Sequence, residues 1–324
     1  MSARHGTGLG LTLALASAAA FGTSGTFARS LLDTGWTPGA AVLLRVTIAA
    51  LVLTVVVAPQ VARHRRHLGR SSRTLAVYGI AAVAGAQLCY FNAVEHLSVA
   101  VALLLEYSGT LLVVVWMWLR HAHRPTPLTV AGAAAAVCGL ALVLDVFGDV
   151  SIDLVGVAWG LGAAVGLATY FVISASTHDA LPPLLTAWGG LVVGATVLGA
   201  AALLGALPFR TAADDVTLLD REVSWLVPLL GMAIVAAAFA YVAGVAGARI
   251  LGAKVASFIG LTEVLFAVLF AWLLVQESLS PIQLVGGGLV VLGIALVKLD
   301  EAPDEPELSG TPDTTVVAAS GDDG

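Results

Sequence analysis

Three ionisable side chains interrupt apolar stretches of the sequence, where a charge is costly. Arg45 lies in "LLRVTIAALVL", Glu106 in "LLLEYSGTLLVVVW" and Glu263 in "LTEVLFAVLFAWLLV". At the centre of a membrane-spanning helix such a residue costs on the order of 2.5–3.5 kcal/mol. Each of the three must therefore face the protein interior, be paired, be protonated or contact water.

Glu106 has two interpretations. As a strut it would hydrogen-bond a neighbouring helix, and as part of a pathway it would bind a proton or a cation. Burial favours the protonated form of a carboxylic acid, and the membrane potential contributes roughly 2.3 kcal/mol per charge per 100 mV. These are the requirements of a proton relay, which is the role we favour for Glu106. For Glu263 the strut and the pathway are equal alternatives.

Arg45 is a candidate substrate-binding residue. A guanidinium grips a carboxylate through two parallel hydrogen bonds, so Arg45 would hold the α-carboxylate of an amino acid while Glu106 faces its ammonium group. The alternative is a direct ion pair between Arg45 and Glu106. Gln87 and Tyr90 are three residues apart and share a helix face. We expect them to line the same cavity, together with Tyr241.

The remaining polar and aromatic residues of the apolar stretches have simpler interpretations. Asn92 is expected to hydrogen-bond a neighbouring helix. Tyr170 fits a cavity or an anchor at the membrane interface equally well, because tyrosine is enriched at both lipid–water boundaries. Trp116, Trp118 and Trp272 are predicted to belong to the interfacial aromatic belts.

The elements that must position these residues are membrane spans. Of the 324 residues, 59% are hydrophobic and 11% are charged, and the mean hydropathy is +0.96. Soluble domains carry about 25% charged residues, and a helical span needs roughly 20 apolar residues. The sequence therefore predicts an all-α polytopic membrane protein. Its ten predicted spans are 9–28, 38–58, 75–94, 98–119, 127–146, 154–174, 184–207, 225–246, 254–275 and 281–299.

Charge in the connecting segments predicts the orientation of the spans. The segment 59–74, interpreted as a loop, carries five arginines and no acid. If the spans alternate, 11 of the 15 Lys and Arg residues fall on the same side as this loop. Positive loops face the cytoplasm, so both termini are expected inside the cell, with the protein in the inner (plasma) membrane. The acidic segment 300–324 lacks apolar periodicity and is predicted to be a disordered cytoplasmic tail.

The chain repeats itself. When Pro127 is aligned with Pro281, "PLTVAGAAAAVCGLALV" falls on "PIQLVGGGLVVLGIALV", and upstream Tyr90 falls near Tyr241. The predicted domains are residues 1–146 and residues 154–299, with five spans each. An odd number of spans forces the two copies into opposite orientations, which is the inverted repeat of many secondary transporters.

These stretches resemble the EamA family of the drug/metabolite transporter superfamily. The likeness covers roughly residues 9–299 and includes Glu277 before the tenth span. Thr110 and Val264 stand where members of that family often carry a proline, so these two helices lack the residue that would kink them. The resemblance implies export of small metabolites by alternating access, without a cofactor.

The leading hypothesis is therefore a secondary transporter that exports amino acids or their analogues, with proton-coupled antiport as an option. The alternative is a membrane-embedded enzyme or lipid-handling protein. Catalysis needs a convergent set of nucleophile, base or metal ligands, which the sequence does not suggest, so no enzymatic activity and no metal are expected. The expected partners are a small-molecule substrate and the lipid bilayer, with a homodimer left open and no nucleic acid.

Overall fold

The computed structural model describes residues 2–97, 99–121, 124–146, 153–176, 181–219, 221–275 and 280–300. Glu277 and the predicted tail beyond Asp300 lie outside these ranges. Eight of the described helical segments are long and apolar enough to cross a bilayer, and a shorter apolar helix accompanies them. The fold is that of an all-helical polytopic membrane protein, as predicted.

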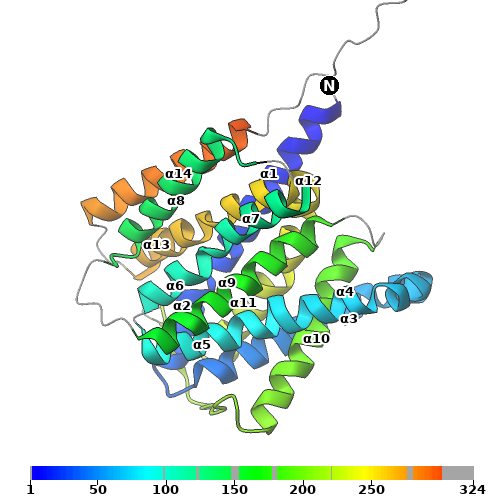
Figure 1. The fold of residues 1–324 in the computed structure, drawn as a ribbon. Coiled ribbons are helices and arrows are strands. Elements are labelled where there is room, and N and C mark those ends of the chain that lie inside the picture. The colour runs from blue at the N-terminus through cyan, green and yellow to red at the C-terminus, as the bar shows by residue number, and fades with distance from the viewer. Residues whose placement is uncertain are drawn as a thin grey trace, which may run out of the picture.

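The first half of the chain forms five spans, several of which are interrupted. Its helices are α1 (Ser2–Gly22), α2 (Ser24–Leu32), α3 (Pro38–Arg70), α4 (Ser72–Val77), the π-helix η1 (Tyr78–Gly85), α5 (Ala86–His96), α6 (Val99–Tyr107), α7 (Gly109–His121) and α8 (Pro127–Val143) (Figure 1). The first span combines α1 and α2, the third runs from α4 to α5, and the fourth combines α6 and α7.

The second half contains five further spans and a β-hairpin. Its elements are α9 (Leu154–Ala175), α10 (Pro183–Leu203), β1 (Val216–Leu218), β2 (Arg221–Val223), α11 (Leu226–Ala233), the π-helix η2 (Ile234–Phe239), α12 (Ala240–Gly260), α13 (Thr262–Val275) and α14 (Pro281–Asp300). The hairpin, which the sequence analysis did not predict, lies within the connection 207–224 and pairs Val216 with Val223.

The eighth and ninth spans meet inside α12, at Gly252. This residue has φ 79° and ψ 162°, which is not helical. The contacts with α1 show the two directions of the chain. Residues 240–250 run antiparallel to residues 10–17 of α1, whereas residues 255–266 run parallel to residues 14–22. The chain therefore reverses direction at a single residue, where the sequence analysis expected a loop of several residues.

Substituting Gly252 tests this reversal. Its backbone angles lie in a region that essentially only glycine occupies, at a cost of about 1–3 kcal/mol for other residues. We expect Gly252→Ala to lower the thermal unfolding midpoint measured in detergent. Gly288→Ala is the matched control, because Gly288 is in helix α14 and a Cβ there meets nothing within 4 Å. Equal midpoints for the two variants would show that the reversal tolerates a side chain.

The fourth and ninth spans break at equivalent positions, although neither break contains a proline. In the fourth span the Ser108 hydroxyl donates a 2.5 Å hydrogen bond to the Leu105 carbonyl. In the ninth span the Thr262 hydroxyl donates one of 2.6 Å to the Ile259 carbonyl. Hydroxyl groups that bond back to the preceding turn bend helices. In the alignment of Pro127 with Pro281, Ser108 falls on Thr262 and Leu105 falls on Ile259. The two repeats therefore bend through equivalent hydrogen bonds.

The last helices of the two repeats, α8 and α14, pack against each other in opposite directions. Gly132 lies against Gly293, and Gly139 lies against Gly286. Because α8 and α14 occupy equivalent places in the two copies, their antiparallel packing is the geometry of an inverted repeat.

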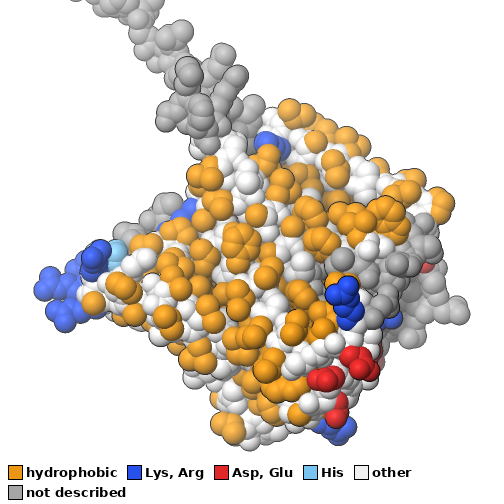
Figure 2. All heavy atoms as spheres, turned by 180° about the vertical axis from the view of Figure 1, so that it is seen from behind, with side chains coloured by type: hydrophobic (Ala, Val, Ile, Leu, Met, Phe, Trp, Pro, Cys, Tyr) orange, Lys and Arg blue, Asp and Glu red, His pale blue; other side chains and the backbone are white. Residues whose placement is uncertain are grey.

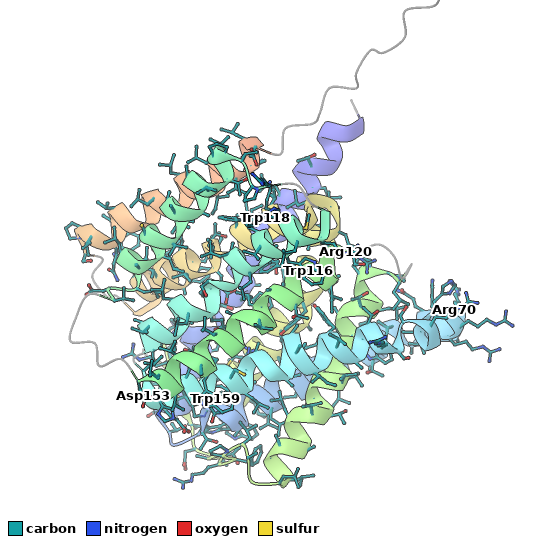
Figure 3. All side chains as sticks on the ribbon, viewed as in Figure 1. Arg70, Trp116, Trp118, Arg120, Asp153 and Trp159 are labelled. Carbon is teal, nitrogen blue, oxygen red and sulfur yellow. The ribbon has the colours of Figure 1, made fainter. Side chains whose placement is uncertain are left out.

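The basic segment 59–74 is helical, which corrects its interpretation as a loop. Helix α3 continues to Arg70 and α4 begins at Ser72, with the buried Ser71 as the turn between them. Arginine is a good helix former. In addition, Val61 and Leu68 recur at helical spacing and pack on the apolar cluster around Leu75. The helix projects from the bundle, with Arg70 at its tip (Figure 3).

Charged and aromatic side chains mark the two ends of the bundle. Arg120 and the tip of α3 lie toward one end and Asp153 toward the other (Figure 3). Trp116 and Trp118, close to Arg120 in sequence, are 49% and 42% exposed, as expected of belt residues. Asp153 caps α9 by accepting hydrogen bonds from the first backbone N–H groups of the helix, which hold the pKa of this carboxyl below its usual value.

Candidate functional site

A cavity of about 760 Å³ lies between the two repeats. Its volume is within the range of about 300–1,000 Å³ that is typical of small-molecule sites. It contains all six residues singled out from the sequence: Arg45, Gln87, Tyr90, Glu106, Tyr241 and Glu263. These side chains come from α3, α5, α6, α12 and α13, so the fold brings together residues from five helices.

Arg45 is held in the cavity wall without an ion-pair partner. Its side chain is 7% exposed, and its Nη1 donates a 2.8 Å hydrogen bond to the Ser24 hydroxyl. Its buried Nε has no hydrogen-bond partner. Among the described residues, no carboxylate lies within ion-pair distance of Arg45, so it is not paired directly with Glu106 in this conformation. A buried polar group without a partner is costly, and a ligand carboxylate would relieve that cost.

The two glutamates flank the two helix breaks. Glu106 lies two residues before Ser108, and Glu263 lies two residues after Leu261, in the first turn of α13. The positive end of the helix dipole favours a carboxylate in a first turn. Each break thus carries one acid beside it.

The charges of the cavity lie close enough to influence one another. Glu106 interacts electrostatically with Glu263 and Arg45, and the Tyr107 hydroxyl lies against the Glu263 carboxylate. When all three charged groups are ionised, one guanidinium and two carboxylates leave one net negative charge. A proton or a cationic group entering the cavity would neutralise it.

The tyrosines of the protein gather at this cavity. Four of the five line it, and the fifth, Tyr78, stacks on Tyr170 with ring centroids 6.0 Å apart. The Tyr241 ring meets Tyr170 edge-on at 5.7 Å and Phe21 at 5.2 Å. Aromatic faces attract cations and apolar groups, so this wall suits an amphipathic ligand.

The structure corrects one sequence interpretation, decides another and adds two residues to the site. Of the two alternatives left open for Tyr170 the cavity is correct, because the residue is buried and lines it. Asn92 donates a hydrogen bond to the Leu88 carbonyl of its own helix, not to a neighbouring one. Tyr107 and Ser24 contact the charged groups but carry no signal in the sequence beyond, for Tyr107, its place next to Glu106.

The cavity extends to one end of the bundle. Its lining includes Leu32, Asp33 and Pro38, where α2 meets α3, and Val94 and Val99, which flank the connection from α5 to α6. No described residue from the opposite end of the bundle, where the tip of α3 lies, belongs to the lining.

Polar contacts close that opposite end. Lys254 forms a 3.2 Å ion pair with Asp300, and Asp300 accepts hydrogen bonds of 2.5 Å from Thr126 and Thr129. These contacts join α12 and α14 of the second repeat to the start of α8 in the first. Arg249 adds hydrogen bonds to the Leu181 carbonyl and the Thr186 hydroxyl. In the described part of the chain, no three His, Cys, Asp or Glu side chains are placed to hold a metal ion.

Comparisons with known proteins agree with this architecture. A model of the EamA-like transporter family matches twice, over residues 8–145 and 154–299. An uncharacterized transporter of Archaeoglobus fulgidus is 26% identical over 234 residues, which cover 71% of this chain and 78% of that protein. The uncharacterized transporter YwfM of Bacillus subtilis is 25% identical over 289 residues, 86% of this chain and 89% of that one. A crystal structure at 18% identity superposes with a TM-score of 0.70, covering 90% of this chain and 96% of the other, and so has the same fold.

Proposed function

The chain belongs to the EamA-like transporter family, and from this premise we propose that it exports small zwitterionic metabolites, amino acids or their analogues, by alternating access. It is a multi-pass membrane transporter. The observation that carries the proposal is the meeting of one buried arginine and two glutamates in a single cavity built by both repeats. Export is the direction that the sequence resemblance implies.

The charges of the cavity match a zwitterion. The Arg45 guanidinium, whose Nε lacks a partner, binds the substrate carboxylate in the bidentate geometry that guanidinium groups favour. Glu106 faces the substrate ammonium group. The aromatic wall around Tyr241 contacts the apolar part of the substrate. A substrate with both charges thus meets an opposite charge at each end.

Proton coupling follows from the surplus carboxylate. The empty cavity carries the excess negative charge of its second glutamate. A proton on Glu106 neutralises this charge, and a neutral cavity avoids the cost of moving a buried charge between the two membrane faces. The substrate ammonium group binds the same carboxylate, so the proton and the substrate exclude each other there. We therefore propose that one proton crosses in exchange for one substrate.

The conformation supports a two-state cycle. If the basic end of the bundle faces the cytoplasm, the cavity opens outward, and the contacts of Lys254 and Arg249 close the inner side. Exchange of the conformations of the two inverted repeats would close the outer opening and open the inner one. The helix breaks at Ser108, Gly252 and Leu261 are the points about which the repeats would bend.

Transport by vesicles tests the proposal. Purified protein is reconstituted into liposomes loaded with labelled amino acids, and release is measured after a pH gradient is imposed. We expect gradient-driven release from the wild type. Glu106→Gln keeps the shape of the side chain but cannot ionise. For this variant we expect the response to the gradient to fall by at least about tenfold, which corresponds to ~1.4 kcal/mol.

Two controls separate a role in transport from a structural one. Glu222→Gln changes an exposed glutamate in β2 and should transport as the wild type does. The thermal midpoint of Glu106→Gln should stay close to that of the wild type, because a strut would lose stability. Undiminished gradient-driven release by Glu106→Gln would rule out the relay, and a transport defect fully explained by unfolding would favour the strut.

A further inference from the structure

The projecting end of α3 is the most basic surface of the described protein. It carries five arginines between residues 63 and 73, four on α3 and one on α4, all of them exposed. The sequence contains no Asp or Glu between Asp33 and Glu95. Lys and Arg side chains gather at the outer end of the projection in the space-filling view, beside a surface that is mostly hydrophobic (Figure 2). We call this surface, Arg63 to Arg73, the basic tip.

The basic tip stands where a bilayer has its phosphates. Helix α3 has 33 residues, or about 50 Å at ~1.5 Å per residue, whereas the hydrocarbon core is about 30 Å thick. The apolar part of α3 ends at Ala58, so the following turns emerge from the core into the headgroup layer. The arginines of the tip begin about 8 Å beyond Ala58 along the helix, so the first of them lie at the level of the headgroups, which form a layer of about 5–8 Å on each side of the core.

The tip is a rigid surface with two different faces. Val57, which is fully buried, and the half-buried Val61 and Leu68 pack on the cluster formed with Leu75 and Leu185. This packing turns the other face of the helix away from the protein. Arg63, Arg66 and Arg70 recur at helical spacing on that outer face, so their guanidinium groups form one row.

We propose that the basic tip is a binding site for the headgroups of anionic phospholipids. Guanidinium groups match the geometry of phosphate oxygens and bind them bidentately. Polybasic segments next to a membrane span attract anionic lipids, an interaction confined to within a Debye length of the surface. A lipid phosphate is already present at this depth in the bilayer, whereas a soluble partner would have to be recruited.

Bound lipid would act on the closed end of the transporter. The turn of the tip, Ser71, is 1% exposed and lines a small pocket with Leu181, Thr186 and Arg249. Arg249 donates to Leu181 and Thr186 across that pocket. Headgroups that fix the tip therefore also support the contacts that close this end of the bundle.

Native mass spectrometry of the full-length protein tests the site without measuring transport, so its result is independent of the proposed function. The protein is released from vesicles of equal phosphatidylglycerol and phosphatidylcholine, and bound lipids are counted. We expect the wild type to retain phosphatidylglycerol preferentially. A variant with the five tip arginines changed to glutamine should retain at least fivefold less of it. The control Arg210→Gln/Arg221→Gln, which changes two exposed arginines at the opposite end, should behave as the wild type does.

Further outcomes decide whether the tip binds lipid and where the bound group comes from. Equal retention of phosphatidylglycerol by the tip variant would overturn the proposal. Complete displacement of the lipid by inorganic phosphate would assign the site to free phosphate, and this too would overturn it. The seven acidic residues after Asp300 are the other candidate occupant. If changing them to their amides raises lipid retention, the acidic segment occupies the tip instead, and unchanged retention supports the lipid site. The arginine variants change exposed residues, and unaltered thermal midpoints confirm that all variants fold.

Discussion

Arg45→Gln should raise the KM for an amino acid substrate by about 10- to 150-fold, because it removes a charged hydrogen-bond pair worth about 1.5–3 kcal/mol. The guanidinium lines the cavity, is fixed by Ser24 and leaves its Nε without a partner. Arg45→Lys keeps the charge but replaces the planar fork by a point charge. It should therefore lose a smaller part of the affinity. The measurement is the concentration dependence of uptake or release in reconstituted vesicles.

A comparison of two substrates makes this prediction specific. The amine that corresponds to the amino acid, with the carboxylate removed, has nothing for Arg45 to bind. The wild type should prefer the amino acid, and Arg45→Gln should bind the two about equally. The control Arg221→Gln alters an exposed arginine in β2 and should leave the preference intact. If Arg45→Gln weakens amine and amino acid to the same extent, Arg45 supports the fold of the cavity and does not bind the carboxylate.

Gly139→Leu should destabilise the protein more than any of the other substitutions. It should lower the free energy of unfolding by about 3 kcal/mol, which is the upper part of the usual cost of overpacking. A Cβ at this position would lie 2.6 Å from the Gly286 carbonyl oxygen and 2.7 Å from the Val290 amide nitrogen. Both obstacles are backbone atoms, which cannot move aside as a flexible side chain can. The helices α8 and α14 would have to separate, and with them the contacts between the two repeats. Thermal unfolding in detergent, followed by circular dichroism, measures the effect.

The same helices provide the matched control. Gly288 is in α14, two residues from Gly286, but a Cβ there meets nothing within 4 Å. Gly288→Leu adds the same side chain to the lipid-facing side and should leave the midpoint nearly unchanged, since small residues matter in membrane helices where backbones approach closely. Similar loss of stability in both variants would mean that the added side chain itself, and not the α8–α14 contact, causes the effect.

The sequence was sufficient to predict the spans and their repetition. Lipid has no water to satisfy exposed backbone groups, so long apolar segments must be helices, and this strong constraint acts on each segment separately. The aligned repeats placed Gly132 over Gly286 and Gly139 over Gly293. In the structure the pairs are crossed: Gly132 contacts Gly293, and Gly139 contacts Gly286. Two inverted copies related by a two-fold axis require this crossed pairing.

The sequence was less informative where polar segments leave the membrane and where helices are interrupted. There, single interactions decide the conformation. Packing of Leu68 on the cluster around Leu75 keeps the basic segment helical. The hydroxyls of Ser108 and Thr262 produce bends in helices that lack the expected proline. A scarcity of apolar residues signals a departure from the core but does not distinguish a loop from a projecting helix.

The types of the candidate site residues could be read from the sequence alone, because a charge inside an apolar span is costly and so must serve a purpose. Depth in the membrane, too, follows from counting residues along one helix. Only the tertiary structure decided that Arg45, Glu106 and Glu263 face one cavity, that Arg45 contacts Ser24 in place of Glu106, and that Tyr107 and Tyr170 complete the wall. Which faces of five helices meet depends on how the helices pack and rotate against one another. That information is distributed over many small contacts and is not contained in the periodicity of any single span.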